Sequence, residues 1–397
     1  MSDVEEIVAD LHRREWAAVL AATVRVARDL DLAEESVQEA YVQALERWPR
    51  DGIPDNPAGW LVTAARRRVL DAIRRAEVAR AKLPLLLESE MSGGHDRLSL
   101  VFTCCHPALA REAQIALTLR LVCGVSTGDI ARAFLVSEPT MAARVTRAKK
   151  KIAAARIPFR VPAGADLPER LDAVLSVIHL LYTTGHTAPT GEHLRRIDLS
   201  EQAVILARML RELMPDEPEV RGLLALFLVL EARSATRTDA AGRLLRLEEQ
   251  DRTRWNMALV DEGRALILEG LRPGRYLLQA AIAALHAEAP SYEETDWPQI
   301  VTLYDALLVA WPSPVVALNR AVAVSMADGP AAALRDVEAL ESDARLAGYR
   351  YLPAIKADLL RRLGRRDEAV TAYEAALALT ENAAERTFLS DRLGTLR

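Results

Sequence analysis

The chain of 397 residues has only three cysteines, and aromatic residues make up 5% of it. So few cysteines exclude the disulfide framework that is typical of small secreted domains. The longest apolar run, residues 223–230, is too short to cross a bilayer. The opening segment MSDVEEIVAD is acidic and lacks the apolar core of a signal peptide. We therefore expect a cytoplasmic protein that does not enter a membrane.

Runs of alternating β-branched residues, which are typical of strands, are also scarce. Long segments rich in alanine, leucine, arginine and glutamate recur instead, and half of the residues are hydrophobic. This pattern predicts an all-α fold, and the length is sufficient for two or three domains with cores of their own.

The chain also has little net charge, with 51 Lys+Arg against 56 Asp+Glu and a balance of −5. This balance alone argues against a protein that binds nucleic acid through its overall charge. The charges are unevenly distributed, however. Residues 1–160 hold 24 basic and 21 acidic residues, a balance of +3, whereas residues 161–397 hold 27 and 35, a balance of −8. Binding of phosphate must therefore depend on local clusters.

Residues 126–152 have the pattern of a helix, a tight turn and a second helix with one basic face. Ser137 is placed to cap the second helix, and Pro139 falls in its first turn, where a missing N–H costs nothing. The apolar stripe of this helix is Met141, Val145, Ala148 and Ile152. Another face carries Thr140, Arg144, Arg147 and Lys151. A basic helix face is often only solvated, but the preceding helix and the capped turn favour a helix-turn-helix that enters the major groove.

Residues 30–75 hold a second pair of patterned segments. In the first, the stripe predicted to be buried is Val37, Tyr41, Ala44, Leu45 and Trp48. The side chains predicted to lie outside are Glu34, Glu35, Gln38, Glu39 and Glu46. This acidic face suits a basic helix of a partner, although alone it would be interpreted as a solvated face. A loop follows, and then the arginine-rich segment GWLVTAARRRVLDAIRR, whose density of cations suits a phosphate backbone.

Together these segments resemble the extracytoplasmic-function sigma factors of bacterial RNA polymerase. The AEESVQEAY helix, the NPAGWLVTAARRRVLDAIRR segment and the helix-turn-helix ending in TMAARVTRAKKKI follow one another in the family's order, within residues 1 to 155. The resemblance implies a sigma region 2 helical bundle and a sigma region 4 helix-turn-helix domain. Proline- and glycine-rich segments then divide the chain into residues 1–80, a linker 81–97, residues 98–156, a hinge 157–168 and residues 169–397.

The resemblance also implies roles for particular residues. Those expected to read the −35 promoter element are Thr140, Arg144, Arg147 and Lys151. Those expected to open and read the −10 element are Asn56, Trp60, Arg66, Arg67, Arg74 and Arg75. Those expected to bind the polymerase β′ clamp helices are Glu35, Gln38 and Glu39. The implied partners are promoter DNA and the polymerase core, including its β flap.

The remaining segment, residues 169–397, has a partial helical-repeat pattern. Ala369, Tyr373 and Ala376 fall at the small, large and small positions of the second helix of a tetratricopeptide (TPR) repeat. Ala333 lies 36 residues before Ala369, close to the repeat's period of about 34. Ala321, Val337 and Leu340 are placed similarly. We predict a TPR-like helical solenoid with a protein partner of its own, as in the subgroup of these sigma factors that carries such an extension.

Two other functions remain open at this point. A stand-alone helix-turn-helix regulator with a TPR-like sensor domain would explain residues 126–152 but not the acidic helix or the arginine-rich segment. An enzyme built on Cys104, Cys105 and His106 would lack a paired general acid and base, and adjacent cysteines chelate a metal poorly. We expect these three to be packing residues, with redox sensing as the next alternative. We expect no enzyme activity, no metal and no cofactor.

Overall fold

The structure is a computed structural model that describes residues 3–77, 93–134, 136–162, 166–269 and 273–397. They form two compact units, residues 1–181 and 182–397. The predicted all-α class is confirmed, because helices build both units. The strands in the described part, β1 (Thr190–Gly191) and β2 (Glu381–Asn382), have two residues each.

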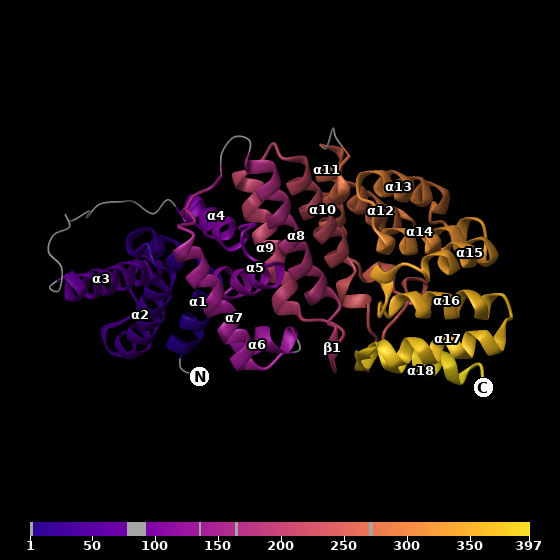
Figure 1. The fold of residues 1–397 in the computed structure, drawn as a ribbon, viewed down its shortest axis with the longest axis horizontal. Coiled ribbons are helices and arrows are strands. Elements are labelled where there is room, and N and C mark those ends of the chain that lie inside the picture. Colours follow the sequence, from indigo (N-terminus) through magenta and orange to yellow (C-terminus); the bar gives the residue numbers. More distant parts are fainter. Residues whose placement is uncertain (1–2, 78–92, 135, 163–165, 270–272) are drawn as a thin grey trace. The chain divides into compact units, whose positions relative to one another are not determined.

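The first unit begins with a three-helix bundle. Its helices are α1 (Asp3–Ala27), α2 (Leu30–Asp51) and α3 (Pro57–Glu77), and each packs on the other two (Figure 1). The side chains that fill the bundle are Trp16, Val19, Leu20, Val37, Tyr41, Trp48, Leu61, Ala65 and Val69. Asp29 begins α2 by accepting a hydrogen bond from the Leu32 N–H at 2.8 Å.

A helix-turn-helix domain follows in the same unit. It comprises α4 (Gly93–Cys104), α5 (Arg111–Leu117), the π-helical turn η1 (Thr118–Val122), α6 (Thr127–Ala133) and α7 (Glu138–Ala154). The predicted start of α7 is confirmed: Ser137 accepts a hydrogen bond from the Thr140 N–H, and Pro139 lies in the first turn. The predicted stripe is buried too, with Met141, Val145, Ala148 and Ile152 each at most 6% exposed.

The bundle and the helix-turn-helix domain meet through α1, which packs against α4 and η1. The indole N–H of Trp16 donates to the Leu121 carbonyl at 3.1 Å. Gly124 has φ +67°, and a Cβ there would lie 3.1 Å from the His12 ring and 3.2 Å from the Trp16 ring. Only glycine therefore permits both this turn and this close approach.

The predicted linker and hinge are described in part. Residues 78–92, which hold most of the predicted linker 81–97, lie outside the described residues, and α4 begins at Gly93. The predicted hinge, residues 157–168, overlaps the start of helix α8 (Leu167–His186) at its last two residues. The division between the two units falls inside α8, and the bounds of the five predicted segments remain predictions.

The second unit continues with four longer helices, α9 (Ile197–Leu213), α10 (Pro218–Ala232), α11 (Met257–Leu268) and α12 (Arg275–Glu288). Helix α10 packs on α9, α11 and α12, which explains why it is apolar on all sides. Short helical turns lie between or after them: η3 (Ser234–Thr236), η4 (Leu247–Glu249), η5 (Arg252–Arg254) and η6 (Ala344–Leu346).

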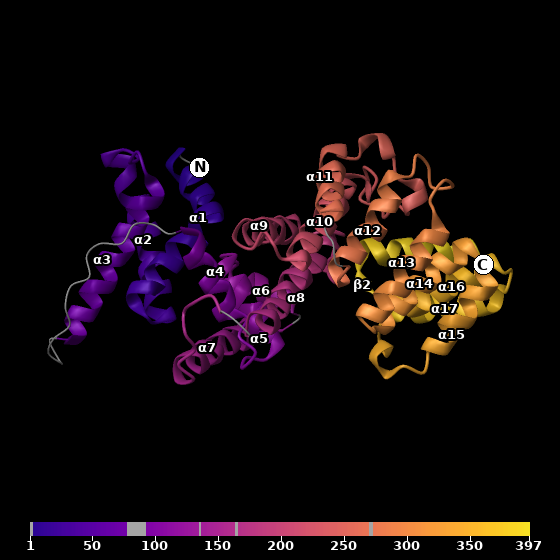
Figure 2. The same ribbon diagram turned by 90° about the horizontal axis from the view of Figure 1, so that it is seen from above.

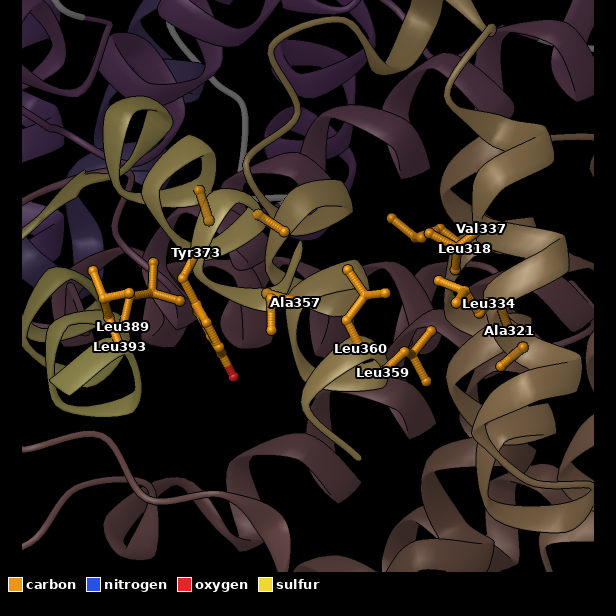
Figure 3. Close-up of a cluster of buried hydrophobic side chains, with 14 of the residues drawn as sticks. Leu318, Ala321, Leu334, Val337, Ala357, Leu359, Leu360, Tyr373, Leu389 and Leu393 are labelled. Atoms are coloured by element: carbon orange, nitrogen blue, oxygen red, sulfur yellow. The ribbon is translucent and has the colours of Figure 1, made fainter. Parts of the chain in front are cut away.

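The remaining helices of the second unit are α13 (Trp297–Ala310), α14 (Pro314–Ala327), α15 (Pro330–Leu340), α16 (Tyr351–Arg362), α17 (Arg366–Leu379) and α18 (Ala383–Gly394). Each packs on the next in the chain, and Figure 2 shows α13, α14, α16 and α17 in one group. Ala369, Tyr373 and Ala376 are buried as their spacing predicts. Tyr373 lies between Leu389 and Ala357 in the cluster of Figure 3.

The two ends of the second unit are joined. Strand β1 pairs in parallel with β2, with Thr190 opposite Glu381 and Gly191 opposite Asn382. Asn382 is fully buried and its side-chain amide donates to the His193 carbonyl at 2.9 Å. Its side-chain oxygen caps α18 by accepting from the Glu385 N–H at 3.2 Å.

Candidate nucleic-acid interface

Helix α7 presents its basic face to solvent. Thr140, Arg147 and Lys151 are exposed, and Arg144 is half-buried because its guanidinium lies over the Phe134 ring, 5.7 Å from the ring centre. Beside this face is a hollow of about 290 Å³ whose other wall is the start of α5. The four predicted −35 residues thus lie together on one exposed side of a rigid, capped helix.

The arginine-rich helix α3 also has an exposed basic face. Arg67, Arg74 and Arg75 are exposed. Arg66 is half-buried, and its pKa is lowered by burial and by the nearby Arg25. Arg68, which belongs to the arginine-rich segment but was not among the residues expected to read the −10 element, forms an ion pair with Glu39 of α2 at 3.3 Å. Helix α3 therefore has three exposed arginines along its length.

Asn56 and Trp60 have structural contacts at the start of α3. The Asn56 side-chain oxygen caps the helix by accepting from the Gly59 N–H at 2.9 Å. Trp60 is half-buried and lies edge-to-face against Trp48, with ring centres 5.4 Å apart. Part of each side chain is therefore engaged in the fold, and only the rest is available to DNA.

The acidic face of α2 differs from its prediction at two positions. Glu34, predicted to lie outside, is buried, because α2 turns this side toward α7 and η1. Leu45, predicted to be buried, is 42% exposed, since Ala44 and Trp48 supply the inward contacts there. Glu35 and Gln38 are exposed as predicted, whereas Glu39 is half-buried beside Arg68.

A buried ion network joins α2 to the helix-turn-helix domain. Lys149 of α7 lies 2.8 Å from the Asp31 carboxylate and 2.5 Å from that of Glu34. Arg120 of η1 reaches the other Glu34 oxygen at 2.6 Å. Burial lowers the pKa of Lys149, but its hydrogen bonds to Asp31 and Glu34 outweigh burial and raise the pKa above the usual value. Lys149 stays charged, and the pairing holds the two modules together.

The sequence contained a signal for this network. Lys149 follows Val145 by four residues and precedes Ile152 by three, so it lies on the same inward side of α7 as the apolar stripe. A lysine at such a position needs a buried carboxylate. Glu34 occupies the matching position on α2, three residues before Val37 and seven before Tyr41 of the buried stripe. The Gln38 amide also donates to it at 3.2 Å.

Comparison with known families identifies the two modules. Residues 99–152 match the model for sigma-70 region 4, and residues 11–78 match the model for sigma-70 region 2. The chain belongs to the sigma-70 family. Its region 2 and region 4 domains support a role in promoter recognition and transcription initiation.

The similarity extends beyond these two regions. This sigma-70 protein is 46% identical over 394 residues to an uncharacterized protein of Rhizobium meliloti (strain 1021). The matched region covers 95% of this chain and 93% of the relative. Residues 170–270 match a family described as a family of unknown function (DUF6596). No solved structure matches the chain.

Two adjacent cysteines of the sigma-70 protein lie in its core. Cys104 and Cys105 are fully buried, and burial raises the pKa of Cys105 to about 12 and that of Cys104 well above its usual value. Both stay protonated thiols at neutral pH, the form that neither attacks nor binds metal. In the part of the chain that the structure describes, no group of three His, Cys, Asp or Glu side chains is placed to hold a metal ion, and no helix has the length and apolarity to span a bilayer.

Proposed function

We propose that this protein is an extracytoplasmic-function sigma factor, which directs the core RNA polymerase to specific promoters in the cytoplasm. The observation that carries the proposal is the presence, in one chain, of region 2 and region 4 domains whose basic helices α3 and α7 both face solvent. A protein of this kind performs no covalent chemistry. It acts by binding polymerase and DNA at once.

Helix α7 would read the −35 element. Arg144 and Arg147 each carry a guanidinium that can bind a guanine edge in bidentate fashion, and Thr140 lies at the helix N-terminus, which enters the groove first in such motifs. Lys151 lies two turns beyond Arg144, where a contact with phosphate would fix the position of the helix on the DNA.

Helix α3 would act at the −10 element. Arg67, Arg74 and Arg75 would hold the phosphate backbone, while the half-exposed Trp60 ring offers a surface on which an unstacked base can rest. Asn56 would contact DNA through its side-chain NH2 group, since its oxygen caps the helix at Gly59. Arg66 would contribute mainly by its charge.

The exposed face of α2 would bind the β′ clamp helices. Beside Glu35 and Gln38 it carries two exposed apolar side chains, Val42 at 48% and Leu45 at 42%. An apolar centre with charged neighbours is typical of a protein interface. Glu39 would contact polymerase only after its ion pair with Arg68 is broken.

The Lys149 network suggests that the free protein differs from the bound one. Asp31 and Glu34 lie on α2 next to the proposed polymerase face, and Lys149 lies on α7 next to the proposed DNA face. We infer that polymerase binding separates region 2 from region 4 and breaks this network. The energy for that separation would come from the polymerase contacts.

The second unit would support this activity as a TPR-like extension that binds a protein partner. Its helices pack each on the next, and the small and large residues of the predicted repeat are buried. By the family resemblance, we expect such an extension to be needed for full transcription. Deletion of residues 182–397 would then reduce transcription by a first unit that still binds core polymerase.

Transcription of a genomic DNA library by purified core polymerase tests the proposed function. We expect new transcript starts that appear only with the protein and disappear with Arg144→Ala and Arg147→Ala together. A stand-alone regulator is the alternative. It would bind duplex DNA, fail to co-purify with core polymerase and start no transcripts.

A further inference from the structure

The proposed function leaves unused a cleft of about 950 Å³ within the first unit, where the α1–α2 corner faces the end of α7. One side is residues 24–31, and the other is residues 149–159. Its floor is apolar, with Val24, Leu30 and Ile152 all buried. A volume of this size lies at the upper end of the range of small-ligand sites, about 300–1,000 Å³.

The walls of the cleft are strongly basic. The cations are Arg25, Arg28, Lys149, Lys150 and Arg156, and the carboxylates are Asp29 and Asp31. Lys149 is engaged in the ion network, and Arg25 lies 3.6 Å from the Asp96 carboxylate. Arg28, Lys150 and Arg156 are exposed, and none has an ion pair among the described residues. Three unneutralised cations thus surround one apolar floor.

Two of these three cations occupy an unfavourable backbone conformation. Arg28 has φ +53° and Arg156 has φ +49°, and the described chain has no other non-glycine residue with positive φ. Glycine or asparagine would form either turn at lower energy. Each ends a helix in the left-handed cap that usually takes glycine, Arg28 after α1 and Arg156 after α7, and the two caps line one cleft from opposite sides.

We propose that this cleft binds a nucleotide with two or more phosphates. Arg28, Lys150 and Arg156 would hold the phosphates by charge-assisted hydrogen bonds, and the nucleoside ring would lie on the apolar floor beside Phe159. The apolar floor favours a nucleotide over inorganic polyphosphate. The concave shape favours a small ligand over duplex DNA, whose convex backbone does not enter such a cleft.

A ligand in this cleft touches region 2 and region 4 at once. It therefore binds the arrangement in which the Lys149 network is formed more tightly than one in which the regions have separated. Such a ligand lowers promoter activity by holding the regions together. This consequence rests on the proposed function, whereas binding itself does not.

Titration of the full chain with the fluorescent nucleotide N-methylanthraniloyl-ADP tests the proposal. The variants are Arg28→Gly, Arg156→Gly and the double variant, because glycine removes the guanidinium while easing the turn, so the fold is retained. Arg160→Gly, in the same segment but outside the cleft, is the matched control. We expect binding at one site, weakened about tenfold by each variant and about 100-fold by both, and unchanged in the control.

Competition with unlabelled compounds completes the test. ADP should displace the probe, and adenosine or pyrophosphate should do so far more weakly. Absence of saturation at about 1 mM, or wild-type affinity in the double variant, overturns the site. Pyrophosphate equal to ADP overturns the nucleotide assignment, and a single-stranded oligonucleotide tighter than ADP overturns the small-ligand assignment. Because no polymerase is present, failure of the proposed function appears separately, as lack of binding to core polymerase.

Discussion

Arginines on the basic faces of α3 and α7 in the first unit differ from the paired arginines of the second unit. In the first, Arg67, Arg74 and Arg147 are exposed, with no ion pair among the described residues. In the second, the arginines that pair with carboxylates include Arg195 with Glu231 at 2.9 Å, Arg208 with Glu262 at 2.5 and 2.8 Å, and Arg350 with Glu385 at 2.9 Å. The number of arginines is therefore a poor guide to DNA binding. What matters is whether a carboxylate lies within reach, and residues 161–397 have eight more carboxylates than cations.

The largest expected effect is on stability, and it concerns the paired charges within the first unit. Glu34→Ala should lower the free energy of unfolding by about 3 kcal/mol, because it leaves the buried Lys149 with only the exposed Asp31 carboxylate and leaves Arg120 without its partner. Glu35→Ala, at the exposed neighbouring position, should change it by less than about 0.5 kcal/mol. Urea unfolding of the full chain measures both, and equal stability of the two variants would show that the network contributes nothing.

The same network predicts a pH dependence. Since the native pKa of Lys149 is raised above 10.5, its contribution to stability is present below pH 10.5 and is lost as the pH rises through the native pKa. The difference in stability between wild type and Lys149→Met should therefore stay constant up to about pH 10.5 and shrink at higher pH. A difference that shrinks well below this pH, or that stays constant above it, would contradict the ion pairing.

Next in size is the effect of removing unpaired arginines. Arg144→Ala or Arg147→Ala should weaken promoter binding by about 1–3 kcal/mol each, if each guanidinium reads a base edge. Arg208→Ala, which removes a guanidinium from the second unit, serves as the control. A mobility shift with a selected promoter measures the effect, and wild-type affinity in both α7 variants would remove this helix as the −35 reader.

A smaller effect is expected at the polymerase surface. Glu35→Lys should weaken binding to core polymerase by about 1 kcal/mol and slow association, because an exposed charge mainly steers the encounter. Glu6→Lys, exposed on α1, is a charge-matched control. Surface plasmon resonance with immobilised core polymerase gives the association and dissociation rates. Identical rates for the two variants would mean that the exposed face of α2 does not bind polymerase.

The smallest effect belongs to the paired arginines of the second unit. Arg208→Ala should cost less than about 1 kcal/mol of stability, because Arg208 and Glu262 are both well exposed and water screens the pair. Thermal unfolding measures it. A loss comparable to that of Glu34→Ala would mean that pairing matters equally in the two units.

The sequence predicted the helices and their apolar stripes well, because periodicity is a local property. The capped start of α7 and its inward side chains were correct for this reason. The error at Glu34 has a different origin. Whether an acidic side chain faces water depends on what covers it, and here the cover is Lys149, 115 residues away. The inward position of Lys149 indicated that some buried carboxylate was needed, but not which one. The cleft between Arg28 and Arg156 had no such signal, since a positive φ at arginine leaves no mark on composition or spacing.

The pairing of β1 with β2 makes the second unit a closed helical array instead of an open one. An open helical array can gain or lose a helix pair at its end, and it unfolds from that end inward. Here Asn382 is bonded to the carbonyl of His193, so the last helix is fastened to the first part of the same unit. Such a unit is closed, so that removal of either end would take away the contacts of the other end as well. It should fold slowly, because its closing contacts join residues far apart in the chain.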